Sequence, residues 1–206
     1  MNADQLLEHY ATGEREFFQA NLRTASLSEV YLAEVNLTRS DLANAVLSQT
    51  VLRQANLSEA NLTAATLRRT DLRGAKLTWA TLNRSSLIRA RVSKATLLQA
   101  SLIKTDLRLA DLRYADLTGA NLTGADLRYA NLFSANLTGA ILTRADLTGA
   151  NLSKANLTRA CLDQAILIRT TLLSANLTGV NLTCVNLRRA TLTDATFPIA
   201  ALTLQR

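Results

Sequence analysis

ADLTGANLTGADLRYANLFSANLTGA, residues 115–140, carries one pattern without a slip: a leucine at every fifth position and an alanine three residues after it. The spacing holds from Phe17 to Leu202 and gives 38 repeat centres, of which 35 are Leu, two are Phe and one is Val. Two residues before the centres, the 37 positions from Ala20 to Ala200 hold 27 Ala, four Val, four Thr and two Ser. A core built from this chain therefore combines one large residue type with one small type.

A five-residue period matches neither a helix nor a flat strand. Leucines five residues apart would be distributed around all sides of an α-helix and would not form a heptad stripe. On a strand they would alternate between the two faces. Leucine-rich repeats need longer units with unequal spacing. The chain must therefore turn a corner once per repeat, so that the centre and the small residue before it point inward and the other three residues point outward.

Such a chain winds into a coil whose neighbouring turns pair as strands about 4.8 Å apart. The small residue is required near each corner because a larger side chain would overfill the narrow interior. Glycine at the last position of a repeat, as at Gly119, Gly124, Gly139, Gly149 and Gly179, suits a corner with positive φ, as in a type II turn.

The motif Ala-(Asp/Asn)-Leu-x-x, as in ADLTG, ANLTG and ADLRY, resembles the pentapeptide-repeat proteins over residues 17–202. The resemblance implies an all-β fold, a right-handed quadrilateral β-helix (a solenoid) with four repeats per coil and about nine coils. A spacing of 20 residues, as four repeats per coil require, is supported by a column of threonines: Thr38, Thr78, Thr118, Thr138, Thr158 and Thr178.

The residues before the first repeat predict a cap. Asn2 and Gln5 have the spacing of a capping box, and Gly13 fits the position after a helix C-terminus, so we expect a short helix over residues 3–11 that covers the first leucine layer. We divide the chain into an N-terminal capping helix at 1–14, a β-helix at 15–202 and a C-terminal tail at 203–206. The stretch HYATGEREF, residues 9–17, also resembles the start of cyanobacterial pentapeptide-repeat proteins, including a regulator of heterocyst differentiation.

The C-terminal end has no such cap. Pro198 is expected to interrupt the pairing, and no helix of useful length is expected after it. The last coil is then left poorly covered, and we expect end-to-end self-association through it.

Residues that carry chemistry are few. His9 is the only histidine, Cys161 and Cys184 lack a metal-binding spacing, and no phosphate loop or zinc-protease motif appears. We therefore expect no enzymatic activity, no cofactor and no metal site. The absence of an apolar run of membrane-spanning length and of a secretory signal leads us to expect a cytoplasmic protein without membrane contact.

Two outward columns are polar. Asp106, Asp126 and Asp146 share a column that could bind a cation, but arginines two positions after Asp106 and Asp126 favour ion pairs along and across the coils. A column of asparagines is expected to form an amide ladder: Asn136, Asn156 and Asn176.

Basic residues gather on two of the four faces. The net charge is +7, and the faces whose first centres are Leu27 and Leu32 hold 14 of the 23 basic residues against eight acidic ones. Outward aromatic residues lie among these arginines, and this combination is typical of interface hot spots. We predict that the partner-binding residues are Arg89, Arg108, Leu109, Arg113, Tyr114, Arg128, Tyr129 and Phe133.

The surface favours a non-catalytic scaffold, which could be regulatory in role, whose rigid faces bind another protein. The resemblance also suggests gyrase-associated mimicry of DNA, but that role needs an acidic surface and this chain is positively charged. Direct nucleic-acid binding through the arginine-rich faces is the remaining alternative, although interspersed aspartates weaken it. Ice binding through the threonine column is a fourth hypothesis, and Leu98 interrupts that column.

Overall fold

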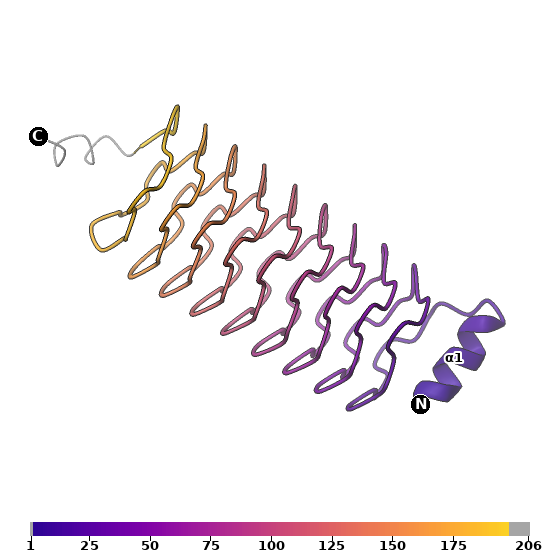
Figure 1. Ribbon diagram of the computed structural model, residues 1–206. Coiled ribbons are helices and arrows are strands. Elements are labelled where there is room, and N and C mark those ends of the chain that lie inside the picture. Colours follow the sequence, from indigo (N-terminus) through magenta and orange to yellow (C-terminus); the bar gives the residue numbers. More distant parts are fainter. Residues whose placement is uncertain (1, 198–206) are drawn as a thin grey trace, which may run out of the picture.

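The chain winds into a straight rod of stacked coils, with one short helix at its N-terminal end (Figure 1). The computed structural model describes residues 2–197. Within them, 32 parallel β-bridges each join residues that are 20 apart, from Glu16 and Asn36 to Asn176 and Thr196. The bridges are single residues separated by turns, so this part of the chain has no extended strand of several residues. Four repeats therefore make one coil, as the columns in the sequence indicate.

The interior contains the two residue types that the repeat supplies. Every repeat centre from Phe17 to Leu177 is buried, and almost all the small residues two positions before these centres are buried as well. At the C-terminal end the interior is less complete, because Leu182, Leu187, Leu192 and Phe197 are only partly buried. The core is thus a continuous column of leucine and alanine along the rod.

Backbone hydrogen bonds hold the coils together and also form each corner. Around one repeat, Leu127 N donates to the Asp146 carbonyl oxygen at 2.7 Å and Tyr129 N donates to the Thr148 carbonyl oxygen at 3.0 Å, both in the next coil. The corner itself is closed by Ala130 N, which donates to the carbonyl oxygen of Leu127 at 3.0 Å. This turn needs a positive φ at its second central residue.

Positive φ at the corners extends beyond the glycines. The glycines expected at corners do have positive φ, such as 65° at Gly119, but so do bulky residues such as Tyr129, at 59°. Among the described corners from Gln19 to Asp194, Cys184 alone lacks a positive φ. A left-handed conformation costs an L-residue roughly 1 kcal/mol or more, so the inter-coil hydrogen bonds and the buried core must offset this cost at each non-glycine corner.

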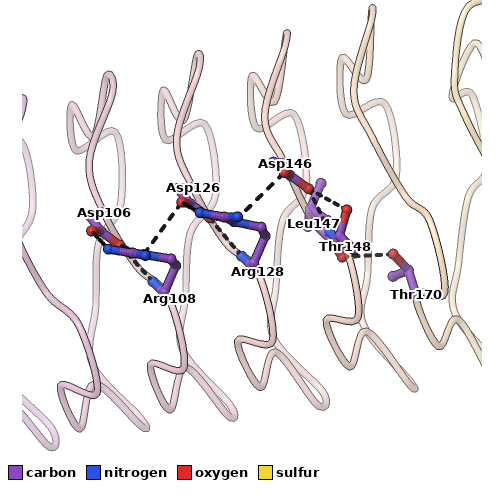
Figure 2. Close-up of polar contacts among 8 residues, drawn as sticks. All are labelled: Asp106, Arg108, Asp126, Arg128, Asp146, Leu147, Thr148 and Thr170. Carbon is purple, nitrogen blue, oxygen red and sulfur yellow. Dashed lines mark hydrogen bonds and ion pairs between the residues drawn. The ribbon is translucent and has the colours of Figure 1, made fainter.

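Six Ser or Thr residues occupy the small interior position, and the hydroxyl group of each donates a hydrogen bond to a backbone carbonyl oxygen inside the coil. The Thr170 hydroxyl donates to the carbonyl oxygen of Leu147 at 2.8 Å (Figure 2), and Thr105 donates to Leu82 at 2.7 Å. Each of these two bonds joins the residue to a repeat centre of the preceding coil. The six residues that bond to the carbonyl oxygen of a centre in this or a similar way are Ser40, Thr50, Thr70, Ser85, Thr105 and Thr170.

The helix expected over residues 3–11 is present as α1, Ala3–Ala11, and Asn2 and Gln5 form its capping box. Leu6 is fully buried against the first coil. The Tyr10 hydroxyl donates to the carbonyl oxygen of Ala33 at 2.9 Å, so the helix is also fixed to the coil by a polar contact. As a result α1 covers the N-terminal end of the leucine column (Figure 1).

The C-terminal end is less regular within the described residues. The bridge that the 20-residue period places between Cys161 and Asn181 is missing, although the neighbouring bridge between Ile166 and Asn186 is present. The expectations for Pro198, for the boundary at residue 202, for the tail at 203–206 and for self-association through this end all fall wholly or partly outside residues 2–197. They stay predictions, as does the count of about nine coils.

Residues 2–197 include no helix that is both long enough and apolar enough to span a membrane.

Ala120→Leu tests the interior constraint. Because Ala120 is fully buried beside the corner, the larger side chain should lower the free energy of unfolding by about 1–3 kcal/mol. Thr78→Leu is the matched control, since Leu98 already occupies the same outward position one coil further along, and it should change stability by less than about 0.5 kcal/mol. Urea denaturation measures both, and equal stability of the two variants would contradict a filled interior.

Candidate functional site

A groove lies on the face whose centres are Leu67, Leu87, Leu107 and Leu127. Its lining residues follow these centres by one or two positions, and the 20-residue period stacks them in two outward columns. The groove has a volume of about 460 Å³. We call it the arginine groove, and it is lined by Arg68, Arg69, Ile88, Arg89, Arg108, Leu109, Arg128 and Tyr129.

The arginine groove brings together five of the eight residues predicted to bind a partner: Arg89, Arg108, Leu109, Arg128 and Tyr129. The prediction left out Arg68, Arg69 and Ile88, although the same 20-residue spacing that relates Arg108 to Arg128 also reaches them. Leu109 and Tyr129 are 47% and 60% exposed and give the groove an accessible apolar part.

The other three predicted residues, Arg113, Tyr114 and Phe133, belong to the next face. Tyr114 and Phe133 pack edge to face, with ring centroids 5.7 Å apart, and Lys154 Nζ lies 5.6 Å from the Phe133 ring centroid. Arg113 pairs with Asp111, with Nε 2.7 Å from Oδ1. These side chains lie around the corner from the arginine groove, so the predicted patch is divided between two faces.

The predicted pairing of aspartates with arginines is present and forms a continuous ladder (Figure 2). Arg108 Nη2 lies 2.7 Å from Asp106 Oδ2 in its own coil, and its Nε lies 3.5 Å from Asp126 Oδ2 in the next. Arg128 repeats the arrangement, at 2.6 Å from Asp126 and 3.8 Å from Asp146. The guanidinium groups of Arg108 and Arg128 are therefore already occupied by carboxylates of the protein itself.

The ladder favours the charged forms of Asp126 and Arg128. Partial burial raises the pKa of Asp126, but hydrogen bonds from the side chain and backbone of Arg128 outweigh that effect and hold the pKa below its usual range. The same hydrogen bond, with the charge of Asp126, raises the pKa of Arg128 further above its usual value. The aspartate column thus serves as the anionic half of a set of ion pairs.

Asp71, on the neighbouring face, is the most enclosed carboxylate of the described residues. It is 6% exposed and accepts hydrogen bonds from Arg53 Nε at 2.7 Å and from Arg73 Nε and Nη2 at 2.8 Å. Burial raises the pKa of this carboxyl, but the two arginines and the backbone N–H of Arg73 lower it to about 2. Asp71 therefore joins two coils electrostatically.

The Tyr129 ring, which lines the groove, packs against Gly149. A Cβ atom built on Gly149, the corner residue of the next coil, would lie 2.6 Å from Tyr129 Cε1 and 2.7 Å from Cδ1. The ring therefore occupies the space that a side chain at position 149 would need. Gly139 has a similar φ, at 63° against 68°, but nothing lies within 4 Å of its virtual Cβ.

The threonine column lies on a different face, and five of its six hydroxyl groups donate to an Asn or Asp side chain two positions earlier. Thr138 Oγ1 donates to Asn136 Oδ1 at 2.6 Å and accepts from Asn156 Nδ2 at 2.9 Å. The expected asparagine ladder is therefore wrong in detail, because the Asn136 and Asn156 amides bond to threonine hydroxyls of the preceding coil. Hydroxyl groups committed in this way offer little to an external ice lattice.

The remaining polar candidates do not assemble a reactive centre. His9 Nδ1 lies 2.7 Å from Glu14 Oε2 at the cap, and Cys161 and Cys184 are both exposed and free. Across residues 2–197, no group of three or more His, Cys, Asp or Glu side chains is arranged to hold a metal ion.

Comparisons with known proteins agree with this architecture. The family model described as pentapeptide repeats (8 copies) matches residues 16–54, 40–78, 90–128, 130–167 and 162–198. HetL from the cyanobacterium Nostoc sp. strain PCC 7120, a pentapeptide repeat protein involved in heterocyst differentiation regulation, is 39% identical, with 97% of this chain and 98% of HetL covered and a TM-score of 0.58.

A second similar structure supports the fold alone. A trypsin-treated variant of QnrB1, a plasmid-mediated fluoroquinolone resistance protein, has 17% identity, 92% coverage of both chains and a TM-score of 0.71. A search of curated proteins gave no match. The family and these structural neighbours imply that the coil is a right-handed β-helix.

Asp71→Asn tests the electrostatic link between coils. The carboxyl pKa falls from the usual 3.8 to about 2 on folding, so the charge stabilises the fold above pH 4 and this contribution is lost as pH falls through 2. We expect the variant to be less stable by about 2 kcal/mol at pH 7, and the difference to shrink between pH 4 and pH 2. Urea denaturation across this pH range measures it.

Asp163→Asn is the control for this prediction, because Asp163 is exposed and forms no ion pair within the described residues. It should leave stability nearly unchanged at every pH. A gap between the Asp71 variant and the parent that is as large at pH 2 as at pH 7 would show that the loss arises from packing and not from charge.

Proposed function

This chain belongs to the pentapeptide-repeat family, and from that premise we propose that it is a non-catalytic scaffold that binds another protein through one face of its rod. Only the exceptions to the repeat can make one face different from another, because the leucine and alanine positions are buried throughout most of the chain. The arginine groove is such an exception, and it is the observation that carries the proposal.

Three features support a protein partner at this groove. Exposed Leu109 and Tyr129 lie beside arginines, and aromatic residues with arginine are enriched at interface hot spots. Tyr129 is seated against Gly149, so its ring loses little freedom on binding. The groove is built on a rod whose coils are joined by backbone hydrogen bonds, which holds the binding residues at fixed spacing.

We extend the proposal to a regulatory role in the cytoplasm. Its support is the similarity to HetL over nearly the whole of both chains, together with the involvement of HetL in heterocyst differentiation regulation. Nucleic-acid binding through the arginine-rich faces is the alternative, and the net charge of +7 favours it over mimicry of DNA.

Replacing Leu109 and Tyr129 with Ala tests the scaffold proposal. The double variant should capture at least tenfold less of a specific partner from a lysate of the source organism, because hot-spot aromatic residues each contribute about 2 kcal/mol or more. Capture is quantified by mass spectrometry of the bound proteins. Trp79→Ala with Leu98→Ala is the matched control, since Trp79 is a comparably exposed aromatic corner residue on another face.

A second pair of variants tests whether the orientation of the Tyr129 ring matters while the tyrosine itself is kept. Gly149→Ala should displace the tyrosine ring and weaken capture, whereas Gly139→Ala imposes a similar backbone strain without touching the ring and should leave capture intact.

Equal capture by the parent and by the Leu109 and Tyr129 double variant, with both folded by circular dichroism, would remove the arginine groove as the binding face.

A further inference from the structure

Three arginines of the groove differ from the other two. Arg108 and Arg128 are held by the Asp106, Asp126 and Asp146 carboxylates. Among residues 2–197, no carboxylate lies within ion-pair distance of Arg68, Arg69 or Arg89, which are all exposed. These three side chains are the cationic end of the groove.

The sequence explains why this end is unpaired. In the coils of Arg108 and Arg128, an aspartate stands two positions before the arginine and accepts both of its side-chain hydrogen bonds. The same column holds Thr66 and Ser86 in the two preceding coils, so Arg68 has no carboxylate in its own repeat and none in the next. Arg68 therefore lies beyond the end of the aspartate column.

At the opposite end of the groove, exposed apolar side chains lie beside arginines that are already paired with aspartates. Within the groove, the corner column runs from Arg69 and Arg89 to Leu109 and then Tyr129, one coil at a time. Ile88 lies beside Arg89 and lines the groove as well. Along the rod axis, this corner column therefore presents two positive charges first and two apolar side chains next.

We propose that the arginine groove binds an acidic segment of a partner protein, with its carboxylates on Arg68, Arg69 and Arg89 and an apolar or aromatic side chain on Leu109 and Tyr129. This inference rests on the proposed scaffold function and names the chemistry of the partner. Charge complementarity selects carboxylates, because guanidinium groups without an internal partner form bidentate hydrogen bonds with them.

The spacing defines the segment further. Arg89 and Tyr129 are two coils apart, or about 10 Å at 4.8 Å per coil, and an extended peptide covers this distance in about three residues. The recognised segment is therefore a short run of acidic residues followed about three positions later by an apolar side chain.

A nucleic acid fits the groove less well. Binding through phosphates relies on many contacts spread along the duplex or strand, whereas the unpaired guanidinium groups here are three and lie within neighbouring coils. Beyond them the polar column carries the carboxylates of Asp106, Asp126 and Asp146, whose pairing with arginine leaves no excess positive charge to extend the track.

The test uses the full chain and a fluorescein-labelled synthetic peptide with three consecutive glutamates and a phenylalanine three residues after the last. Fluorescence anisotropy should show saturable binding that weakens as salt is added. The triple variant Arg68→Gln, Arg69→Gln, Arg89→Gln should bind at least about tenfold more weakly. Glutamine is chosen because Gln19 and Gln49 already occupy corners with positive φ.

The matched control removes the same number of charges elsewhere. Arg84→Gln, Lys104→Gln and Arg159→Gln change three exposed corner residues with positive φ on other faces, and the triple control should bind like the parent. A peptide with glutamine in place of glutamate should not bind. Replacing the phenylalanine of the peptide with alanine should weaken binding to the parent but not to the Leu109 and Tyr129 double variant.

Other outcomes overturn the inference in distinguishable ways. Equal losses in the two triple variants would show general charge attraction and no groove site. Tighter binding of a single-stranded DNA oligonucleotide than of the peptide, lost in the groove triple variant, would assign the groove to nucleic acid. If the peptide fails to bind while the parent still captures a partner that depends on Leu109 and Tyr129, the acidic-segment inference fails and the scaffold function stands.

Discussion

The narrow interior is the constraint on which the rest of this structure depends. Each coil has room for one leucine and one small residue per side, and the sequence meets that requirement at almost every repeat. Dispersion contacts and apolar burial along this column favour the coil, while the backbone hydrogen bonds between coils fix the register at 20 residues. Everything that differs between the faces is then left to the three outward positions.

The corners show how the backbone and the surface are linked. All but one of the described corners have a positive φ, and the chain accepts it even at Trp79, Tyr114 and Tyr129. Large side chains at these corners project from the rod, whereas a glycine there leaves space that a neighbour can fill, as Gly149 does for Tyr129. The positive φ is unfavourable for each non-glycine corner residue, but it places the exposed ring of Tyr129 at the edge of the candidate site.

The sequence predicts the fold well because its signal is repeated, and predicts the site less well because the site is an exception. Leu and Ala spacing indicates the coil, and Asn2 with Gln5 indicates the cap, since both are local patterns. The division of the predicted patch between two faces depends on which side of a corner Tyr129 and Phe133 lie. The hydrogen bond from the Asn156 amide to the Thr138 hydroxyl depends on side-chain rotamers, which the repeat pattern of the sequence does not determine.

The 20-residue register is the central claim, since it decides which outward residues share a face. Pyrene excimer fluorescence tests it directly in a chain with Cys161→Ser and Cys184→Ser. With pyrene on Thr118→Cys and Thr138→Cys, residues 20 apart, we expect strong excimer emission because adjacent coils are about 4.8 Å apart. With pyrene on Thr123→Cys and Thr138→Cys, 15 apart and on different faces, emission should be monomeric. Excimer emission from the second pair and not the first would contradict a coil of four repeats.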